Sequence, residues 1–203
     1  ITISIDTVEE QVEKIMKSSW NKFKIKCNGF SSSNLELFLK LGVQFSLDAN
    51  SSFTKEDCCW LQGNTNSQNI LYIEQPLLIG NFHCLDSDKF VNWMADEDAQ
   101  NANQLDKLLT HYSTINIKLM KCGGLTPALS FIENAKKLGF KVMLGCMTES
   151  SIGISAACAL SGLLDFADLD GANLISNDYA TGSFVENGKI YLSEKPGLGI
   201  SIL

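Results

Sequence analysis

The most constraining feature of this sequence is a repeat of short apolar runs, each of which ends in a charged residue or a cysteine. The runs end at Lys26, Asp48, Glu74, Asp96, Lys118, Cys146 and Asp170, so successive ends lie 22 to 28 residues apart. A step of this size is the length of one strand plus one crossover helix, which is typical of stacked βα units. With the strand-like run 1–6 in front, the sequence predicts eight parallel strands.

Eight parallel strands joined by helices predict an α/β fold of the TIM type, a (β/α) barrel in which chemistry lies at the C-terminal ends of the strands. The chain has 203 residues, of which 45% are hydrophobic, whereas a complete barrel of this type usually needs about 250 residues. We therefore expect 1–175 to form the catalytic barrel and a segment upstream of Ile1 to be missing. The tail 176–203 carries the hairpin signal Asn187-Gly188, and we expect it to form a hairpin and strap that dock on the absent part.

Charge and cysteine usage narrow the class of partner. The net charge of −7 argues against nucleic acid, because nucleic-acid binding relies on a basic face. No apolar run reaches the length of a membrane span. The seven cysteines are scattered and odd in number, so they predict reduced packing residues in a cytoplasmic protein and not a disulfide framework or a zinc site. We expect a small-molecule ligand, with no nucleic acid and no membrane partner, and leave a homo-oligomer open.

Local signals predict where helices and strands begin and end. Helix starts are expected at the capping boxes Thr7/Glu10 and Ser33/Glu36, at Thr54, and at Thr126 with Pro127 in the first turn. The first helix is expected to bury Val8, Val12, Ile15 and Met16. The expected strands are 1–6, 23–26, 43–48, 70–74, a strand ending at 96, 115–119, 141–147, and an eighth that carries Asp168 and Asp170 on one face; 63–69 is expected to be a loop.

Three lysines lie within or at the end of predicted strands. Lys24 and Lys26 share one face of their strand, because side chains repeat every second residue. Two ammonium groups so close disfavour each other's charged form, which makes a lysine a usable base, with Lys24 supporting Lys26. Lys118 ends the strand I-N-I-K. For any of these lysines alone, an edge strand with its lysine in solvent is the simpler interpretation.

The predicted barrel brings carboxylates together. The third, fourth and fifth strands are neighbours, so Asp48, Glu74 and Asp96 are expected on one side of the barrel mouth. Three carboxylates with no histidine nearby suit a hard cation, and Mg²⁺ fits best. Because the second and sixth strands are opposite each other, Lys26 and Lys118 are expected to face each other across the ligand.

The eighth strand is opposite the fourth, so Asp168 and Asp170 are expected to hold a cationic group on the far wall. Asn50 follows Asp48 on the same side. Cys146 and Met147 lie at the end of the seventh strand, and these five residues form the expected substrate-binding set. A substrate with a carboxylate, an ammonium group and an acidic carbon between two lysines fits this arrangement.

Six short motifs carry a family resemblance. They are K-I-K at 24–26, D-A-N at 48–50, I-E-Q-P at 73–76, A-D-E at 95–97, I-K-L-M-K-C-G-G at 117–124 and D-L-D-G at 168–171. In this order and at this spacing, 1–175 resembles the barrel of the enolase superfamily, in its muconate-lactonising subgroup, and most of all the dipeptide epimerases of the L-Ala-D/L-Glu epimerase type. One departure is A-D-E-D, ending at Asp98, where the family usually has A-D-E-S.

The resemblance implies Mg²⁺ as cofactor at Asp48, Glu74 and Asp96, Lys26 and Lys118 as the acid/base pair, and Asp168 with Asp170 on the substrate's free amino group. It also implies an N-terminal α+β capping domain. The implied function is that of an isomerase: Mg-dependent epimerisation of a dipeptide at the α-carbon of its C-terminal residue, by 1,1-proton transfer through an enediolate.

Three alternatives stay open. A cycloisomerase or an o-succinylbenzoate synthase-like lyase of the same superfamily would use the same metal and lysines. The substrate of such an enzyme has no ammonium group for Asp168 and Asp170 to hold, so this pair of aspartates argues against it. A non-catalytic ligand-binding barrel belongs to another class. A barrel with a Schiff-base lysine is disfavoured because it does not need three converging carboxylates. The two histidines, His83 and His111, lie off the repeat and are expected at the surface.

Overall fold

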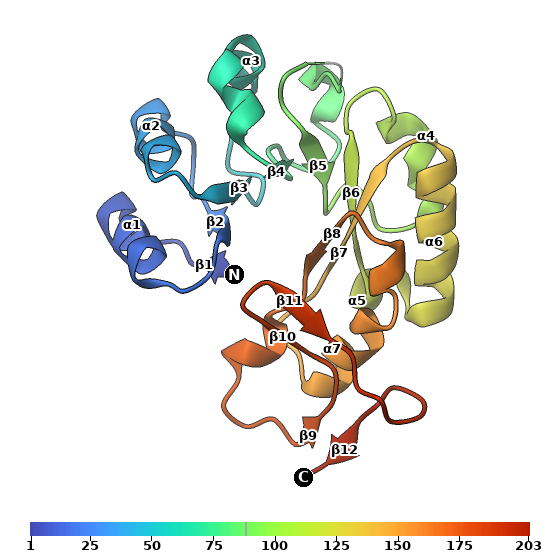
Figure 1. Cartoon of the computed structure of the whole chain (residues 1–203). Coiled ribbons are helices and arrows are strands. Elements are labelled where there is room, and N and C mark those ends of the chain that lie inside the picture. The colour runs from blue at the N-terminus through green and yellow to red at the C-terminus, as the bar shows by residue number, and fades with distance from the viewer. Residues whose placement is uncertain (88) are drawn as a thin grey trace. The chain divides into compact units, whose positions relative to one another are not determined.

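The structure is a computed structural model and describes residues 1–87 and 89–203. The chain divides into two compact units, residues 1–98 with 104–114 and residues 99–103 with 115–203. Strands and helices alternate along each unit (Figure 1). The sheet order of β1 to β8 is their order in the chain, and the strand pairs within each unit are parallel. The predicted α/β class with eight parallel strands is confirmed.

The first unit contains five strands of this sheet and the helices between them. Its elements are β1 (Thr2–Ile3), α1 (Val8–Lys17), β2 (Lys22–Lys26), α2 (Ser32–Lys40), β3 (Gln44–Asp48), α3 (Lys55–Gly63), the 3₁₀ helix η1 (Thr65–Asn69), β4 (Ile73–Glu74), η2 (Phe82–Cys84), β5 (Trp93–Ala95) and α4 (Leu105–Leu108). The short η3 (Ala102–Gln104) and β6 (Thr114–Lys118) connect to the second unit.

The second unit continues the alternation and ends in short antiparallel strands. It contains α5 (Leu119–Cys122), α6 (Leu125–Lys137), β7 (Lys141–Gly145), α7 (Ser151–Cys158), η4 (Ser161–Leu163), β8 (Phe166–Asp168), η5 (Gly171–Leu174), β9 (Ala180–Thr181), β10 (Phe184–Glu186), β11 (Lys189–Tyr191) and β12 (Ser201–Ile202). Asn187 and Gly188, with φ of 49° and 74°, join β10 to β11. The predicted two-residue hairpin is confirmed.

The register of the first unit aligns the strand ends that carry charge. Asp48 lies opposite Lys26 of β2 on one side and opposite Glu74 of β4 on the other. Glu74 in turn lies opposite Met94 of β5. Pairing continues past the strand ends, because the Ala49 amide donates to the Glu74 carbonyl at 3.0 Å. Parallel strands in register therefore bring these ends to one edge of the sheet.

Two helix starts agree with prediction and two do not. Thr7 and Thr54 are N-caps in capping boxes, with Glu10 and Asp57. The predicted Ser33 cap is wrong: the N-cap of α2 is Ser31, two residues earlier, because the hydroxyl of Ser31 accepts from the Asn34 amide. The predicted Thr126 cap is also wrong. Gly124, with φ of 117°, precedes α6, so Thr126 already lies inside the helix, and Pro127 is in its first turn as predicted.

The buried stripe of α1 differs from the apolar pattern. Ile15 is buried as predicted, Val8 and Val12 are half-buried, and Met16 is 66% exposed. Gln11 is buried instead, because its amide donates to the carbonyls of Ser4 and Lys26, both at 2.9 Å. A polar side chain thus occupies the interior where it satisfies two backbone groups.

Several predicted strands are longer than the observed ones. The run 1–6 pairs only at Thr2–Ile3, the run 70–74 only at Ile73–Glu74, and the run 141–147 ends at Gly145. Asp170 lies beyond β8, and 65–69 is a 3₁₀ helix instead of a loop. Alternation of apolar residues reports burial, and Ile70 and Tyr72 are indeed buried although they lie outside β4. The Tyr72 carbonyl still accepts from the Leu47 amide of β3 at 3.1 Å, so hydrogen bonding to the neighbouring strand begins before the first residue of β4.

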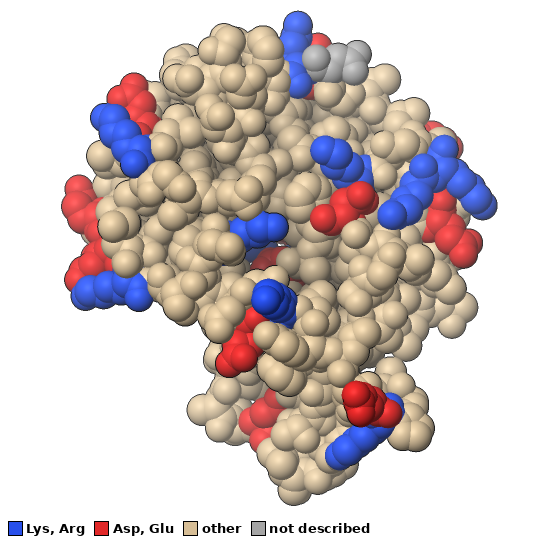
Figure 2. All heavy atoms as spheres, in the orientation of Figure 1, with Lys and Arg blue, Asp and Glu red and all other residues tan. Residues whose placement is uncertain are grey.

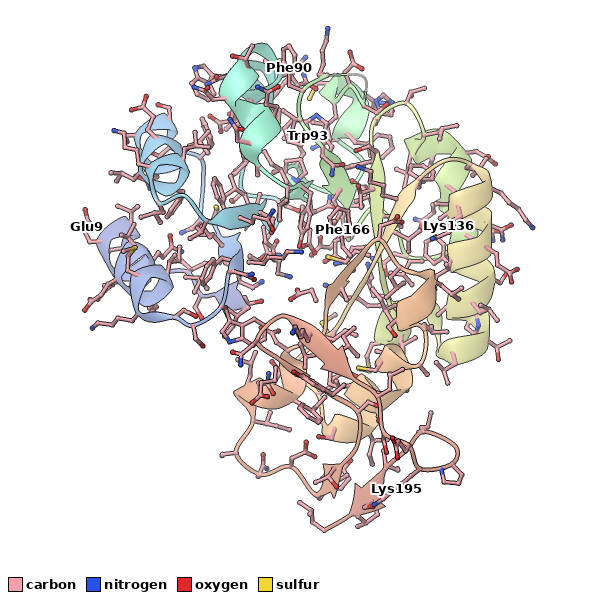
Figure 3. All side chains as sticks on the ribbon, in the orientation of Figure 1. Glu9, Phe90, Trp93, Lys136, Phe166 and Lys195 are labelled. Atoms are coloured by element: carbon pink, nitrogen blue, oxygen red, sulfur yellow. The ribbon has the colours of Figure 1, made fainter. Side chains whose placement is uncertain are left out.

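The largest fully buried side chains are apolar or aromatic. Trp93 on β5 is fully buried, whereas Glu9 and Lys136 extend outward from α1 and α6 (Figure 3). On the face drawn in Figure 2, acidic and basic side chains of the described residues are interspersed and do not gather into one patch of a single sign. Among the described residues, none belongs to a helix with the length and apolar character that crossing a bilayer demands.

The tail 176–203 packs on α7 of its own unit. The buried hydroxyl of Ser155 donates to the Leu198 carbonyl at 2.7 Å and accepts from the Ser183 amide at 2.8 Å. Asp178 accepts from the amide and hydroxyl of Ser151 at the start of α7, and these bonds hold the pKa of Asp178 below its usual value. Docking of this tail on a capping domain, and the boundary at 175, stay predictions.

We expect Ser155→Ala to loosen the tail. The change leaves the Ser183 amide and the Leu198 carbonyl without their shared partner, which costs about 1–3 kcal/mol. Hydrogen exchange should speed up at 180–200 in this variant and stay unchanged in Ser130→Ala, a control on the exposed face of α6. Equal protection of the tail in both variants would contradict the anchoring role.

Candidate functional site

The end of β2 places two lysines against the carboxylate of β3. The Lys26 ammonium donates to Asp48 Oδ2 at 3.0 Å and to Asn50 Oδ1 at 3.1 Å. Lys24 is buried, and its Nζ lies 3.7 Å from Asp48 Oδ2 and 3.5 Å from Glu74 Oε2. The structure thus brings together the predicted acid/base lysine Lys26, its supporting lysine, Asn50 and two predicted metal ligands.

The three predicted metal ligands lie at the ends of three successive strands. Asp48 and Glu74 are opposite each other in the register, and Asp96 follows the last residue of β5. Their exposed fractions are 2%, 0% and 2%. Buried carboxylates need a cation or several donors nearby, because removing an anion from water is costly. In this structure, Lys24 and Lys26 meet the charge of Asp48, and Lys24 that of Glu74.

The donor set fits a hard divalent cation by its chemistry, because it offers carboxylate oxygens only. Across 1–87 and 89–203, no three side chains of the His, Cys, Asp or Glu types are arranged to hold a metal ion as they stand. The contacts of Lys24 and Lys26 to these same carboxylates occupy part of their coordinating capacity. The roles of Asp48, Glu74 and Asp96 as ligands therefore stay a prediction.

Backbone strain gathers at this edge of the sheet. The described residues other than glycine that have positive φ are Asn50 at 41°, Ser51 at 64°, Gln75 at 35° and Asn187 at 49°. Asn187 lies in the hairpin, Gln75 directly follows β4, and Asn50 and Ser51 lie two and three residues beyond the end of β3. Left-handed backbone at non-glycine residues is uncommon and concentrates at functional sites.

Three residues of this edge were missed by sequence reasoning. The buried side chain of Gln75 accepts from the amides of Asp96 and Asp98 and donates to Asp98 Oδ2. The Tyr112 hydroxyl also donates to Asp98 Oδ2, at 2.8 Å. Burial and the Asp98 carboxylate raise the pKa of Tyr112 well above its usual value, so its hydroxyl remains a donor. The only signals were Gln75 in I-E-Q-P and the unusual Asp98 in A-D-E-D.

Lys118 belongs to the second unit and is the last residue of β6. The chain turns at once into α5, which ends at Gly123 and Gly124, both left-handed with φ of 99° and 117°. Asn116, two residues before Lys118, is fully buried. Lys121 in α5 donates to the Asn116 carbonyl at 3.0 Å. The predicted strand and its glycine turn are confirmed, and the role of Lys118 stays a prediction.

The ends of β7 and β8 bring four predicted substrate-binding residues of the second unit together. Asp168 lies opposite Gly145, and Asp170 is 5% exposed. Burial raises the pKa of Cys146 to about 12, and Asp168 and Asp170 add to this effect by their charge. A Cβ at Gly171 would come within 2.1 Å of the Met147 carbonyl oxygen. Glycine in D-L-D-G therefore permits this close approach.

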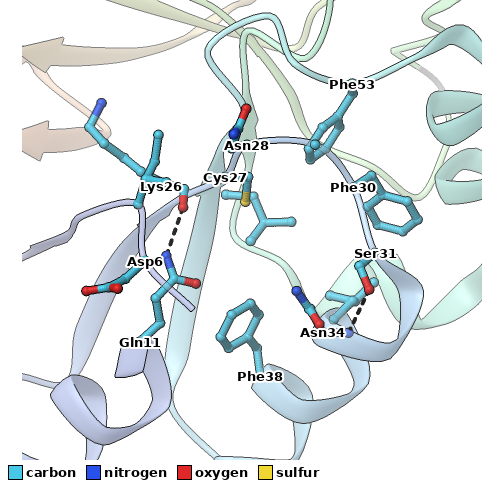
Figure 4. Close-up of a pocket in the computed structure, with 14 residues that line it drawn as sticks. Asp6, Gln11, Lys26, Cys27, Asn28, Phe30, Ser31, Asn34, Phe38 and Phe53 are labelled. Carbon is cyan, nitrogen blue, oxygen red and sulfur yellow. Dashed lines mark hydrogen bonds between the residues drawn. The ribbon is translucent and has the colours of Figure 1, made fainter. Parts of the chain in front are cut away.

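A cavity of about 280 Å³ lies beside β2 in the first unit (Figure 4). Phe30, Phe38 and Phe53 contribute to its wall. Lys26 takes part through its backbone, whose carbonyl accepts from Gln11, while its side chain extends away from the phenylalanines (Figure 4). Of the group of lysines and carboxylates at the ends of β2 to β5, Lys26 is the member that lines this cavity.

The cysteines and histidines agree with prediction only in part: Cys58 and Cys158 are buried as packing residues, whereas Cys59 is exposed. All seven cysteines are free. His83 is exposed as predicted. His111 is half-buried, so its predicted surface position is only partly right. The His111 ring shares a 2.8 Å hydrogen bond through Nδ1 with the Leu85 carbonyl and lies against Phe82.

Comparison with known proteins adds to this geometry. Residues 7–203 match the protein family described as Enolase C-terminal domain-like. An L-Ala-D/L-amino acid epimerase of Flavobacterium johnsoniae is 34% identical to this chain, and the match covers 100% of this chain and 62% of the relative.

Solved structures give a similar result. A dipeptide epimerase from Methylococcus capsulatus complexed with a Mg ion superposes with a TM-score of 0.88 at 28% identity, over 100% of this chain and 64% of that one. A dipeptide epimerase from the same organism, complexed with Mg and the dipeptide L-Arg-D-Lys, gives 0.85 at 29% identity, over 98% and 62%. This chain thus spans about three fifths of the length of the relatives it matches.

Proposed function

This chain belongs to the Enolase C-terminal domain-like family, and on that premise we propose that the protein is a Mg²⁺-dependent dipeptide epimerase. It inverts the α-carbon of the C-terminal residue by 1,1-proton transfer through an enediolate. The observation that carries the proposal is the row of buried carboxylates at the ends of β3, β4 and β5, with Lys24 and Lys26 beside them. The names of the relatives, which are epimerases, support the reaction class.

Asp48, Glu74 and Asp96 are the residues that would hold Mg²⁺. Carboxylate oxygens are the ligands this ion prefers, and burial excludes competing water from the three side chains. When bound, Mg²⁺ would supply Lewis-acid stabilisation to a substrate carboxylate. The relatives of known structure that were solved with Mg support the choice of ion.

The chain's own contribution to the chemistry is proton transfer. Epimerisation needs one group to remove the α-proton and another to return it on the opposite face, and we assign these roles to Lys26 and Lys118. Lys26 is held at the end of β2 by Asp48 and Asn50. Lys118 ends β6, and the glycine turn after α5 fixes the backbone that follows. Lys24, between Asp48 and Glu74, positions both carboxylates and supports Lys26.

A dipeptide is the proposed substrate because the end of β8 offers two acidic side chains for its free ammonium group. Asp168 ends β8 and Asp170 directly precedes η5, and the charges of both help to raise the pKa of Cys146. A charge-assisted hydrogen bond from an ammonium to such carboxylates contributes about 1.5 to 3 kcal/mol. Cys146 and Met147 would line the same part of the site. Dipeptides bound in related structures support this substrate class.

The decisive experiment is isotope exchange. We expect the whole protein, incubated with Mg²⁺ and a dipeptide panel that begins with Ala-Glu in D₂O, to introduce deuterium at the α-carbon of the C-terminal residue alone. Mass spectrometry and NMR of each α-position measure this. Exchange should depend on Mg²⁺ and disappear when a chelator removes it.

N-acetylated dipeptides are the control for the ammonium contact. Acetylation removes the charge that Asp168 and Asp170 would hold, so exchange should fall strongly. If N-acylated amino acids or succinylbenzoate precursors react and free dipeptides do not, the assignment moves to another activity of the superfamily. If no substrate of any of these classes exchanges, the non-catalytic alternative is favoured.

A further inference from the structure

We propose that Gln75, Asp98 and Tyr112 form a positioning network that holds the carboxylates of Glu74 and Asp96 ready for the metal ion. The inference rests on the proposed function, because it concerns the same predicted ligands. All residues of the network lie in the first unit. None of the three touches the ion in this proposal; each acts through the backbone that carries a ligand.

Gln75 ties together the ends of the three strands that carry the carboxylates. Its amide donates to the Met94 carbonyl of β5 at 2.9 Å, and its carbonyl accepts from the Ser51 amide, just beyond β3, at 2.8 Å. To make both bonds directly after Glu74, the residue adopts the left-handed φ of 35°. A non-glycine residue keeps such a backbone only where its surroundings determine it strongly.

The Gln75 side chain then fixes β5. Its Oε1 accepts from the amides of Asp96 and Asp98, both at 3.1 Å, and its Nε2 donates to the Leu77 carbonyl at 2.8 Å. Both polar atoms of a fully buried side chain are thus satisfied. Gln75 is the next residue after Glu74, and its side chain accepts from the Asp96 amide. This hydrogen bond therefore fixes the distance between the backbones of the two predicted ligands, Glu74 and Asp96.

Asp98 and Tyr112 hold this glutamine in place. Asp98 Oδ2 accepts from Gln75 Nε2 at 2.9 Å and from the Tyr112 hydroxyl at 2.8 Å, while Oδ1 accepts from the Gly80 amide at 2.8 Å. Asp98 is 3% exposed and Tyr112 fully buried. The carboxylate therefore selects which way the Gln75 amide points, with Oε1 turned toward Asp96. This gives the aspartate of A-D-E-D a specific role.

A network that positions metal ligands should change metal affinity, and not only the stability of the fold, when it is broken. Groups that orient a metal's ligands typically change metal affinity by about 10- to 100-fold when they are replaced. A purely structural network would lower thermal stability when broken and leave the affinity of the remaining folded protein unchanged. The two roles are therefore separated by measuring both quantities.

The test compares two glutamines in the whole protein. Gln75→Met removes every side-chain hydrogen bond described above at nearly constant volume. Gln62→Met is the matched control, because Gln62 also bridges three groups, the Cys84 carbonyl, the Asp86 amide and Trp93 Nε1, but none of these belongs to a predicted ligand. We expect both variants to unfold at lower temperature. Only Gln75→Met should weaken Mg²⁺ binding, measured by calorimetry and by Mn²⁺ electron paramagnetic resonance, by about 10- to 100-fold.

Tyr112→Phe tests the same network by removing one hydroxyl, and it covers the case in which Gln75→Met fails to fold. It should weaken Mg²⁺ binding in the same direction but by a smaller factor than Gln75→Met. Unchanged Mg²⁺ affinity in folded Gln75→Met or Tyr112→Phe, or an equal loss in Gln62→Met, would overturn the network alone. Absence of Mg²⁺ binding by the unaltered protein would instead overturn the proposed function, and the inference with it.

Discussion

Glu74→Gln is expected to reduce Mg²⁺-dependent turnover by about a thousandfold or more. Loss of a ligand carboxylate removes several kcal/mol of charge stabilisation, and each 1.36 kcal/mol corresponds to a factor of ten in rate. Glutamine preserves the size of a side chain that is fully buried, so the packing of β4 is kept. Turnover of a dipeptide at saturating Mg²⁺ measures the effect.

This substitution also tests stability, because Glu74 lies 3.5 Å from the buried Lys24. Removing one partner of a buried ion pair can cost about 3–5 kcal/mol, although Asp48 remains 3.7 Å from the same ammonium. Circular dichroism and thermal unfolding are therefore needed beside the rate. Glu56→Gln, on the exposed face of α3, is the control and should match the unaltered protein. Full metal-dependent activity in folded Glu74→Gln would refute the ligand assignment.

Lys26→Ala and Lys118→Ala are each expected to abolish epimerisation, a loss of at least about 10²- to 10⁴-fold, the usual contribution of a general acid or base. Each variant retains one lysine. That lysine can still remove the α-proton from the one epimer whose α-proton points toward it. Exchange of the α-proton with D₂O should therefore persist for one epimer in one variant and for the opposite epimer in the other.

Lys22→Ala is the matched control for the lysine pair. Lys22 lies on β2 with Lys24 and Lys26 but at the exposed opposite end of the strand, so its loss should leave both epimerisation and exchange unchanged. Chiral chromatography reports product stereochemistry, and mass spectrometry reports exchange. The two-base mechanism fails if both variants exchange the same epimer, or if both exchange the two epimers equally.

Much of the fold followed from local patterns. The repeat placed a charged residue at the end of successive strands, and the observed ends at Lys26, Asp48, Glu74 and Lys118 agree with it. The reason is that a parallel strand is buried along its length and can carry charge only where it leaves the sheet. Thr7 and Thr54 were predictable for a related reason, since a capping box involves residues only three positions apart.

Lengths of strands and the identity of buried polar residues were not predictable in the same way. Met16 was predicted to be buried and is exposed, whereas Gln11 is buried. The burial of Gln11 depends on two backbone carbonyls, those of Ser4 and Lys26, which accept from its side-chain amide. The predicted Ser33 cap failed because Ser31, two residues earlier, reaches the Asn34 amide. The apolar pattern in the first case and the capping-box signal in the second were each compatible with more than one hydrogen-bonding arrangement.

The sequence by itself determined the eight parallel strands and the positions of the lysines and carboxylates along them, because periodicity and strand ends are local properties of a chain. Only the tertiary structure decided how these side chains are held. Lys24 between Asp48 and Glu74, and Gln75 between Asp96, Asp98 and the end of β3, depend on strand register. Tyr112 reaches Asp98 from 14 residues further along the chain, beyond α4. Hydrogen bonds of buried groups are satisfied by whatever the fold brings near, and no local pattern specifies that partner.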